Sequence, residues 1–549
     1  MNALASARAI IRAPLGKRER TWQDRYTLVL AIAVLGAIAA EPLSRVWNRI
    51  VAPAATTDPA TIGTGLGLVI LAYTGLIALA RLAGPIVVSP ADAAWLVPSP
   101  LTRRAVLRPA ALRLLVASVI AGAVLGVTAL AVLGVPDLAT LRVAGAVLIA
   151  VAACVGGAAL AVLAQRGDPE SDWLGVALAA LAALAIVAGL AAASGAALPW
   201  RSLLTALPRI PASALVGAAV AACLAATGLT VRAWRALSGF PSRAVIGSSA
   251  RVGQATGAIV TLDPGLLTWI AEDNHWRARR LRSRPWPRLP APLALAWAEA
   301  RRLGRRPARL AALLAAAAFP ALTTVATGGI TPPVAVVLFA GALTAAASAT
   351  AVTRRDSENP TLIRMTGVSR QAARAARAIL PALLAAAWLA VALAALGLVG
   401  PGVAAGASWW AFAPLCAPPI AVAALRMAGR GPIDHSLPVL DTPGGPVPLG
   451  PLFWGLTGID VAVLGCAPAL AALLLQPAQT TGFLTAQAVA TALTVGGFLL
   501  RGRGTSSGPP SDVARPARLL SLIFNLARRS AGRDGGGFWR SPDSRAALA

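Results

Sequence analysis

Long apolar segments recur along this chain, and they limit its fold more than any other feature. VAGAVLIAVAACVGGAALAVLA, at 143–164, is one of them, and a run of about 20 apolar residues spans a hydrocarbon core about 30 Å thick. Backbone polar groups cannot stay unpaired in lipid, so such segments must be helical. We predict an all-α, polytopic membrane protein of about twelve transmembrane helices, at 22–40, 61–83, 111–134, 141–164, 173–194, 212–234, 308–327, 332–352, 379–400, 407–428, 452–475 and 479–500.

Composition excludes a soluble fold and favours one orientation in the membrane. Hydrophobic residues make up 57% of the chain, charged residues only 13%, and the mean hydropathy is +0.71. The formal net charge is +28. With the N-terminus inside, the basic residues concentrate on inward segments, as the positive-inside rule requires. We expect a multi-pass plasma-membrane protein with both termini cytoplasmic, whose arginines contact anionic lipid headgroups and which needs no nucleic-acid partner. Only five of the 49 basic residues then lie outside: Arg45, Arg49, Arg142, Arg201 and Arg209.

The order and spacing of the segments repeat once along the chain. LVPSPLTRRAVLRPA (96–110) and IRMTGVSRQAARAAR (363–377) coincide at an offset of 267 residues, and the same offset superimposes several predicted spans. Two like-oriented six-helix halves are a frequent transporter architecture. We therefore expect two six-helix pseudo-repeats. The predicted regions are a first half at 1–234, a cytoplasmic linker at 235–307, a second half at 308–500 and a basic, mostly disordered cytoplasmic tail at 501–549.

Two basic segments outside the spans have the pattern of amphipathic interfacial helices. In the linker, Leu293, Trp297, Ala300 and Leu303 recur at spacings of four, three and three, which places them on one face of a helix. Glu299 and several arginines fill the other faces. An apolar face opposite a charged one suits a helix that lies in the membrane interface. A shorter basic segment of the same kind precedes the first span, at 10–24.

Each half carries a long basic segment in the inner loop between its second and third helices. The first segment, 91–110, holds Trp95 and Leu96 as an apolar anchor, followed by prolines that prevent one continuous helix. The second segment, 354–377, repeats this plan. A short, stiff element joined to two membrane helices would move both helices when a soluble partner presses on it. The alternative interpretation is an ordinary basic inner loop.

The element AWLVPSPLTRRA (94–105), the basic N-terminal helix and the six spans per half resemble the membrane subunits of ATP-binding-cassette exporters of the second permease type. LDPG (262–265) and DTPGGPVPLG (441–450) are similar to segments of uncharacterised actinobacterial relatives of that group. In those exporters the element after the second span is the coupling helix that contacts the ATPase. The resemblance implies a cytoplasmic ATPase subunit, in two copies, as the partner. It places the first contact at Trp95, Leu96, Pro98, Pro100, Arg103 and Arg104, and the second at Leu362, Met365, Gly367 and Arg370.

The second copy departs from the family pattern. It has no tryptophan, and Gly367 stands where the first copy has Pro100. The family also has a re-entrant outer hairpin between its fifth and sixth spans. LPWRSLLTALPRIP (198–211) suits such a hairpin, whereas QPAQTT (476–481) is too short for one. These departures leave open whether the two halves are functionally equivalent.

Motifs for catalysis and metal binding are missing from the sequence. No G-x-x-x-x-G-K-[ST] motif occurs, so the loop that cradles nucleotide phosphates is absent. The two histidines, His275 and His435, lie far apart and no Cys/His cluster has metal-ligand spacing. We expect no catalytic residue, no cofactor and no enzyme activity in this chain. All four cysteines fall within predicted spans, which is typical of packing residues rather than disulfides.

Asp460 is an acidic residue at membrane depth in this prediction. It lies about eight residues into the span 452–475, roughly 12 Å below the inner surface. Ionisable groups at such depth are costly and mark functional sites, here a substrate contact or a proton site. If the span begins near Gly455 instead, Asp460 falls in the first helical turn, where the helix dipole favours an acid. Both interpretations stay open.

Three functions fit the sequence. The first is a permease that moves a hydrophobic or amphiphilic substrate and is driven by a separate ATPase. The second is a secondary transporter of the major-facilitator type, which shares the six-plus-six layout but carries a Gly-Asp-Arg-Gly-like element that RLAGPIVVSPADAAW (81–95) lacks. The third is a scaffold without transport activity whose arginine-rich inner face recruits partners. Co-purification of a stoichiometric ATPase would distinguish the first from the others.

Overall fold

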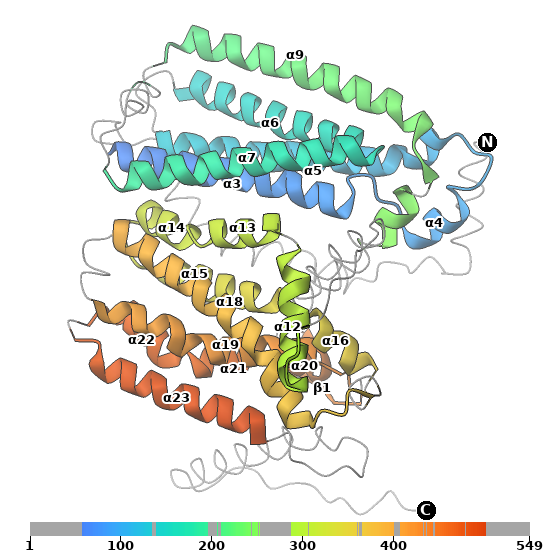
Figure 1. The fold of residues 1–549 in the computed structure, drawn as a ribbon. Coiled ribbons are helices and arrows are strands. Elements are labelled where there is room, and N and C mark those ends of the chain that lie inside the picture. Colours follow the sequence, from blue (N-terminus) through green and yellow to red (C-terminus); the bar gives the residue numbers. More distant parts are fainter. Residues whose placement is uncertain are drawn as a thin grey trace, which may run out of the picture. The chain divides into compact units, whose positions relative to one another are not determined.

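The computed structural model describes a chain whose regular structure is nearly all helical (Figure 1). The predicted span at 22–40, the basic segment at 10–24 and the tail at 501–549 lie outside the described residues. So does most of the predicted outer hairpin at 198–211. The described residues are 58–133, 139–195, 206, 210–250 except 243, 252, 287–359 except 306, 361, 365–399, 407–431, 433–442 except 435, and 445–500 except 478.

The first half contains five long helices that follow the predicted spans. In Figure 1 they lie alongside one another, and contacts join α6 to α5 and α9, and α3 to α7. α3 begins where Asp58 Oδ1 accepts a hydrogen bond from Ala60 N at 3.3 Å, with a proline in its first turn. The helices are α3 (Pro59–Ala83), α5 (Arg103–Leu133), α6 (Ala139–Ala164), α7 (Asp168–Ala193) and α9 (Ala212–Ala236).

Glycines allow α5 and α6 to pack closely. A Cβ atom added to Gly122 would lie 2.4 Å from the Cα atom of Val151, and one added to Gly126 would lie 2.7 Å from the Cα atom of Val147. Small residues at such contacts let two helix backbones approach, and in lipid this packing replaces the hydrophobic effect as the force between helices. Close van der Waals packing of the two backbones therefore holds α5 against α6.

Helices of the second half are shorter and more often interrupted. α15 and α16 are bent by 65° at a short break, within the predicted span 332–352. The predicted span 452–475 is not one helix but three short ones. The elements are α12 (Ala291–Gly304), α13 (Pro307–Ala316), α14 (Phe319–Thr327), α15 (Pro332–Ala347), α16 (Ala351–Glu358), α18 (Arg370–Val399), η4 (Ala407–Ala411), α19 (Phe412–Ala428), α20 (Leu449–Leu456), α21 (Ile459–Gly465), α22 (Ala467–Leu475) and α23 (Thr481–Leu500).

One short hairpin departs from the all-helical expectation. Strands β1 (Val439–Thr442) and β2 (Gly445–Pro448) pair in antiparallel fashion, with Val439 opposite Pro448. The hairpin joins the end of α19 to the start of α20. Its proline-rich sequence cannot continue a helix through this connection.

Across the described residues, nine helical segments are long and apolar enough to cross a membrane, and ten if α15 and α16 form one bent span. These include the predicted span 308–327, built from α13 and α14. The predicted starts of two spans were late. α5 begins at Arg103 rather than 111, and α18 at Arg370 rather than 379. Pro109 and Pro381 lie inside these helices, because a single proline removes one ladder bond without ending a helix whose other residues favour it.

The core of the second half surrounds α19, the most buried of its membrane-spanning segments. Phe412, Cys416 and Ile420 from α19 pack with Leu338 of α15 and Trp388 of α18. Trp388 lies so close to α15 that a Cβ atom on Gly341 would be 2.3 Å from its ring. The large side chain on α18 thus requires a glycine on α15.

Candidate functional site

The first predicted contact lies in the segment between α3 and α5, residues 84–102, which we term the first connector. Its start is anchored by one side chain from the first half and one from the linker that follows it. Ile86 N donates to Gln165 Oε1 at 3.1 Å, and Ser248 Oγ donates to Ile86 O at 3.0 Å. Gly84 has a φ of +90°, and a Cβ atom there would lie 2.4 Å from Ser248 Cβ, so only glycine fits.

The first connector has one buried side and one exposed side. Leu96 and Val97 are buried in a core that includes Leu237 and Phe240. By contrast, the Trp95 side chain is 73% exposed. A large exposed tryptophan next to two buried residues is a rigidly supported contact surface, since the backbone beneath it cannot shift freely.

Local hydrogen bonds explain why this segment forms the short helix α4 (Pro90–Trp95). Ser89 Oγ accepts a hydrogen bond from Asp92 N at 3.0 Å, which caps the helix, and a proline lies in its first turn. Pro98 and Pro100 follow it and are exposed. The prediction of a short, stiff element broken by prolines therefore describes residues 90–102 well, although Pro109 belongs to α5.

The arginines of the first contact are structural as well as exposed. Arg103 Nη1 donates to Phe240 O, and Arg104 Nη2 donates to Arg235 O at 3.0 Å. Both acceptors lie at or just beyond the end of α9. The two arginines therefore tie the first turn of α5 to the end of α9, and they are not in a loop as predicted.

The second predicted contact lies between α16 and α18, at residues 359–369, which we term the second connector. Leu362 lies outside the described residues. Met365 is 83% exposed, and Gly367 has a φ of +66°, a backbone conformation that favours glycine. Ser369 Oγ accepts from Ala372 N at 3.2 Å and caps α18, whose first residue is the exposed Arg370. Met365 is thus an exposed large side chain of the second connector, at a position that the 267-residue offset pairs with Pro98 rather than with Trp95.

The helices on either side of the second connector contribute to a buried ionic cluster that was not predicted from the sequence. Asp356 of α16 forms an ion pair with Arg377 of α18, and the two residues are 7% and 6% exposed. Glu299 of α12 is also 6% exposed, and its Oε2 atom has no hydrogen-bond partner. We term these three residues the ionic cluster. The four-residue spacing of Glu299 and Leu303, which form the buried side of α12, was the only available signal.

Burial changes the protonation of Glu299. Loss of hydration raises the pKa of this carboxyl from 4.5 to about 8, and the positive charges of Arg377 and Arg302 oppose that rise only in part. On the apolar side of α12 predicted from the sequence, Leu293 and Trp297 are exposed. Leu303, from the same predicted apolar side, is buried together with Glu299, so the predicted side is divided between the packed and the exposed surface of α12.

Asp460 lies in the first turn of α21. Its Oδ2 atom accepts a hydrogen bond from Arg426 Nη1 at 3.0 Å, and its Oδ1 atom accepts one from Gly458 N at 2.6 Å. The side chain is 44% exposed. This is the geometry of a helix-capping acid paired with an arginine, and it arises because the predicted span is interrupted just before Ile459.

A second interruption separates α21 from α22, and the buried side chain of Gln487 spans it. Its Nε2 atom donates to Gly465 O at 2.7 Å, and its Oε1 atom accepts from Ala469 N at 3.2 Å. These are the carbonyl and amide groups that would pair in a continuous helix. The Gln487 amide, which is 0% exposed, therefore takes the place of one turn of the backbone ladder.

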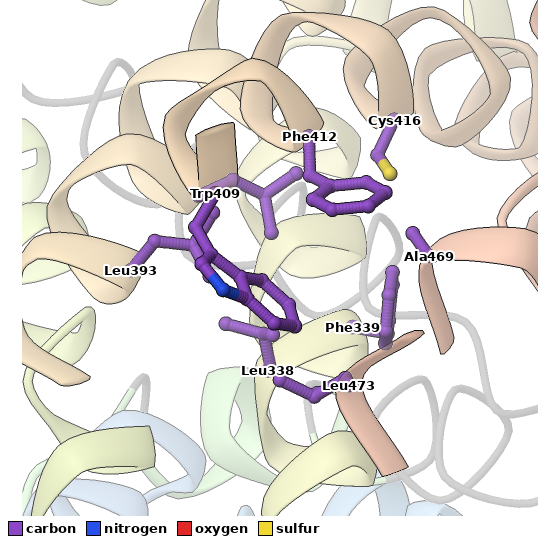
Figure 2. Close-up of a pocket in the computed structure, with 9 residues that line it drawn as sticks. Leu338, Phe339, Leu393, Trp409, Phe412, Cys416, Ala469 and Leu473 are labelled. Carbon is purple, nitrogen blue, oxygen red and sulfur yellow. The ribbon is translucent and has the colours of Figure 1, made fainter. Parts of the chain in front are cut away.

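An apolar pocket lies beside this interruption (Figure 2). Its cavity volume is about 20 Å³, room for little more than a water molecule. The rings of Trp409 and Phe412 face it, with centroids 5.4 Å apart. Residues of α15, α18, α19 and α22 complete the walls, and Cys416 supplies the only sulfur atom among those drawn. No group of three or more potential metal ligands occurs among the described residues.

These features define a largely helical, multi-pass membrane protein with structured connectors between its helices. The model of a family of unknown function, DUF6297, matches residues 56–438, and the chain belongs to that family. The match takes in both connectors, the ionic cluster and α19. No curated protein matches the chain, and no solved structure does.

Proposed function

We propose that this protein is the membrane permease of an ATP-binding-cassette export system, driven by a separate cytoplasmic ATPase. The first connector carries the proposal. It joins two long helices, is held on its inner side by Leu96 and Val97, and presents Trp95 outward. A force applied to Trp95 would therefore reach α3 and α5, and through Arg103 and Arg104 it would reach α9.

The pseudo-repeat is part of the same proposal, and element positions support it. α5 and α18 begin at Arg103 and Arg370, 267 residues apart, and contain 31 and 30 residues. Each follows a connector and has a proline within its first half. The exposed Met365 would then contact the second ATPase copy, three residues beyond the position equivalent to Trp95.

The side chains that line the apolar pocket in the second half support a class of substrate. The pocket beside the α21–α22 interruption is lined by aliphatic and aromatic side chains, and no charged residue lines it. A hydrophobic or amphiphilic substrate suits such walls, because an ionic group would lose its hydration there without a partner. The pocket must widen to admit one, and the interrupted helix beside it provides the point of bending.

Affinity purification of the full-length chain from its native membranes tests the proposal. The expected result is a stoichiometric polypeptide that carries a G-x-x-x-x-G-K-[ST] motif and hydrolyses ATP, captured by a photo-crosslinking residue placed at position 95. Trp95→Ala should weaken that association by about 2 kcal/mol, roughly 30-fold, as exposed interface tryptophans do. Trp173, at the start of α7 and 76% exposed, provides the matched control, since Trp173→Ala should leave the association unchanged.

Other outcomes would overturn the proposal. Proton-driven flux without an ATPase would instead support a secondary transporter of the major-facilitator type. Stable capture of other proteins with no flux would support a membrane scaffold. Equal effects of Trp95→Ala and Trp173→Ala would remove the first connector from the mechanism even if an ATPase is present.

A further inference from the structure

The ionic cluster contains one side chain from each of three helices, of which α12 is distant in the sequence from the other two. α12 packs along α18, and α16 precedes the second connector, which ends where α18 begins. Glu299 is the contribution of α12, Asp356 that of α16 and Arg377 that of α18. The contacts of these side chains therefore decide how firmly the interfacial helix is held against the base of the second connector.

The charges in the cluster do not balance if both acids are ionised. Arg377 is committed to Asp356 by an ion pair. Glu299 Oε2 lacks a partner, as does Thr353 Oγ1 on α16, and both atoms are buried. Two buried carboxylates sharing one guanidinium leave an uncompensated negative charge, which is costly away from water. A proton on Glu299 removes that charge and supplies a hydroxyl that can donate a hydrogen bond.

The remaining charged groups near α12 do not replace that proton. Arg302, on α12 itself, has a favourable electrostatic effect on ionised Glu299 but is outweighed by burial. Arg309 of α13 donates to Ser348 O at 3.4 Å. On α18, Arg374 lies over the ring of Phe498, at 5.7 Å from its centroid, and Arg370 is exposed.

We propose that Glu299 is a proton-binding site, and that its proton holds α12 against α18. Loss of the proton leaves a buried carboxylate that depends on Arg377, which already pairs with Asp356, and so loosens α12. With α12 loosened from α18, the second connector, which leads into α18, would be less constrained. This proposal requires no ATPase partner, so it stands or falls separately from the transport function.

The direction of the pH effect follows from linkage. We call α12 docked when it packs against α18 with Glu299 buried. In the docked state the pKa of Glu299 is about 8, whereas a hydrated glutamate has its ordinary value of 4.5. Between these two values the docked state holds more protons than the undocked state. Docking is therefore strongest below pH 4.5, weakens as the pH rises toward about 8, and changes little above that.

Hydrogen–deuterium exchange of residues 291–304 in the full-length protein, reconstituted in lipid nanodiscs, provides the test. Wild type and Glu299→Gln are compared at each pH, which cancels the intrinsic pH dependence of exchange. Since glutamine mimics the protonated acid, the two should exchange alike at pH 5, and wild type should exchange at least about tenfold faster at pH 8.5. Glu170→Gln, at an exposed acid on α7, should behave as wild type.

A second variant and a spectroscopic reading keep the proposal falsifiable if Glu299→Gln folds poorly. Asp356→Asn frees Arg377 to pair with ionised Glu299. The pH-dependent change in exchange should therefore occur at lower pH in this variant than in wild type. Infrared difference spectra should show the carbonyl band of a protonated carboxyl at pH 7, lost in Glu299→Gln. A wild-type spectrum without that band, or exchange that depends on pH equally in wild type and Glu299→Gln, would overturn the proposal.

Discussion

Two regions of the molecule pair their backbone hydrogen-bonding groups in different ways: the helices α5 and α6 in the first half, and the helices α21, α22 and α23 in the second. α5 and α6 run uninterrupted for 31 and 26 residues, and their glycines bring the two backbones together. α21 and α22 contain 7 and 9 residues, and the ladder between them is completed by Gln487 from α23. In the first region the backbone groups pair within each helix. In the second region a side chain from a neighbouring helix supplies the partners that are missing at the interruption.

Proline placement accounts for much of this difference. Pro418 and Pro419 lie in the middle of α19, and a proline at position 419 cannot donate to Leu415 O. Thr491 Oγ1 of α23 donates to that carbonyl at 2.6 Å. The interrupted region thus depends on polar side chains from one neighbouring helix, and it is the place where a small rearrangement costs least in backbone hydrogen bonds.

The largest effect is expected from Gln487→Leu. This change leaves Gly465 O and Ala469 N without the partners that Gln487 provides, and each buried unpaired group costs about 1–3 kcal/mol. Thermal unfolding in detergent should show a loss of about 2–4 kcal/mol. Thr485→Val, on the exposed side of α23, is the control and should stay within about 0.5 kcal/mol. Equal stability of the two variants would mean that the α21–α22 interruption does not need the amide.

A smaller loss is expected from Gly122→Ala in the first half. The added Cβ atom would meet the Cα atom of Val151 at 2.4 Å, so α5 and α6 must separate. Overpacking of this kind costs about 1–3 kcal/mol. Gly217→Ala on α9 meets nothing within 4 Å and should be neutral or slightly stabilising in the same unfolding assay. If both alanine variants unfold alike, close glycine packing is not what holds α5 to α6.

The smallest effect is expected from Asp460→Asn at the start of α21. The Arg426–Asp460 pair is partly exposed, at 27% and 44%, so solvent screens it. Asparagine keeps the cap and loses only the charge, and unfolding should shift by less than about 1 kcal/mol. A loss of several kcal/mol in the free energy of unfolding would show that the membrane desolvates this ion pair. It would then favour Asp460 as a substrate contact or a proton site.

The apolar segments predicted most of the helices because hydrophobic length is a local property of the chain. The observed bounds of α3, α6, α7 and α9 differ from the predicted ones by a few residues. The prediction was poorer where the helix continues past the apolar run. The first turns of α5 and α18 are rich in arginine, and hydropathy does not detect them.

The resemblance to exporter subunits singled out Trp95 and Met365 from the sequence, and both side chains are exposed in the structure. Sequence reasoning did not reveal that Arg103 and Arg104 bind the end of α9, since those partners are more than 130 residues away. Nor did it predict the role of Gln487. A single glutamine in an apolar helix has no periodic signature, and its partners belong to a break in another helix.

Hydrophobic length alone determined that this is a membrane protein and roughly where its helices lie. Burial depends on what packs against a side chain. Only the tertiary structure therefore decided that Glu299 is buried, that Asp356 pairs with Arg377, and that a predicted span is three helices completed by an amide from a fourth. Charge and hydrogen-bonding groups act over a few ångströms in space, and the sequence does not record those distances.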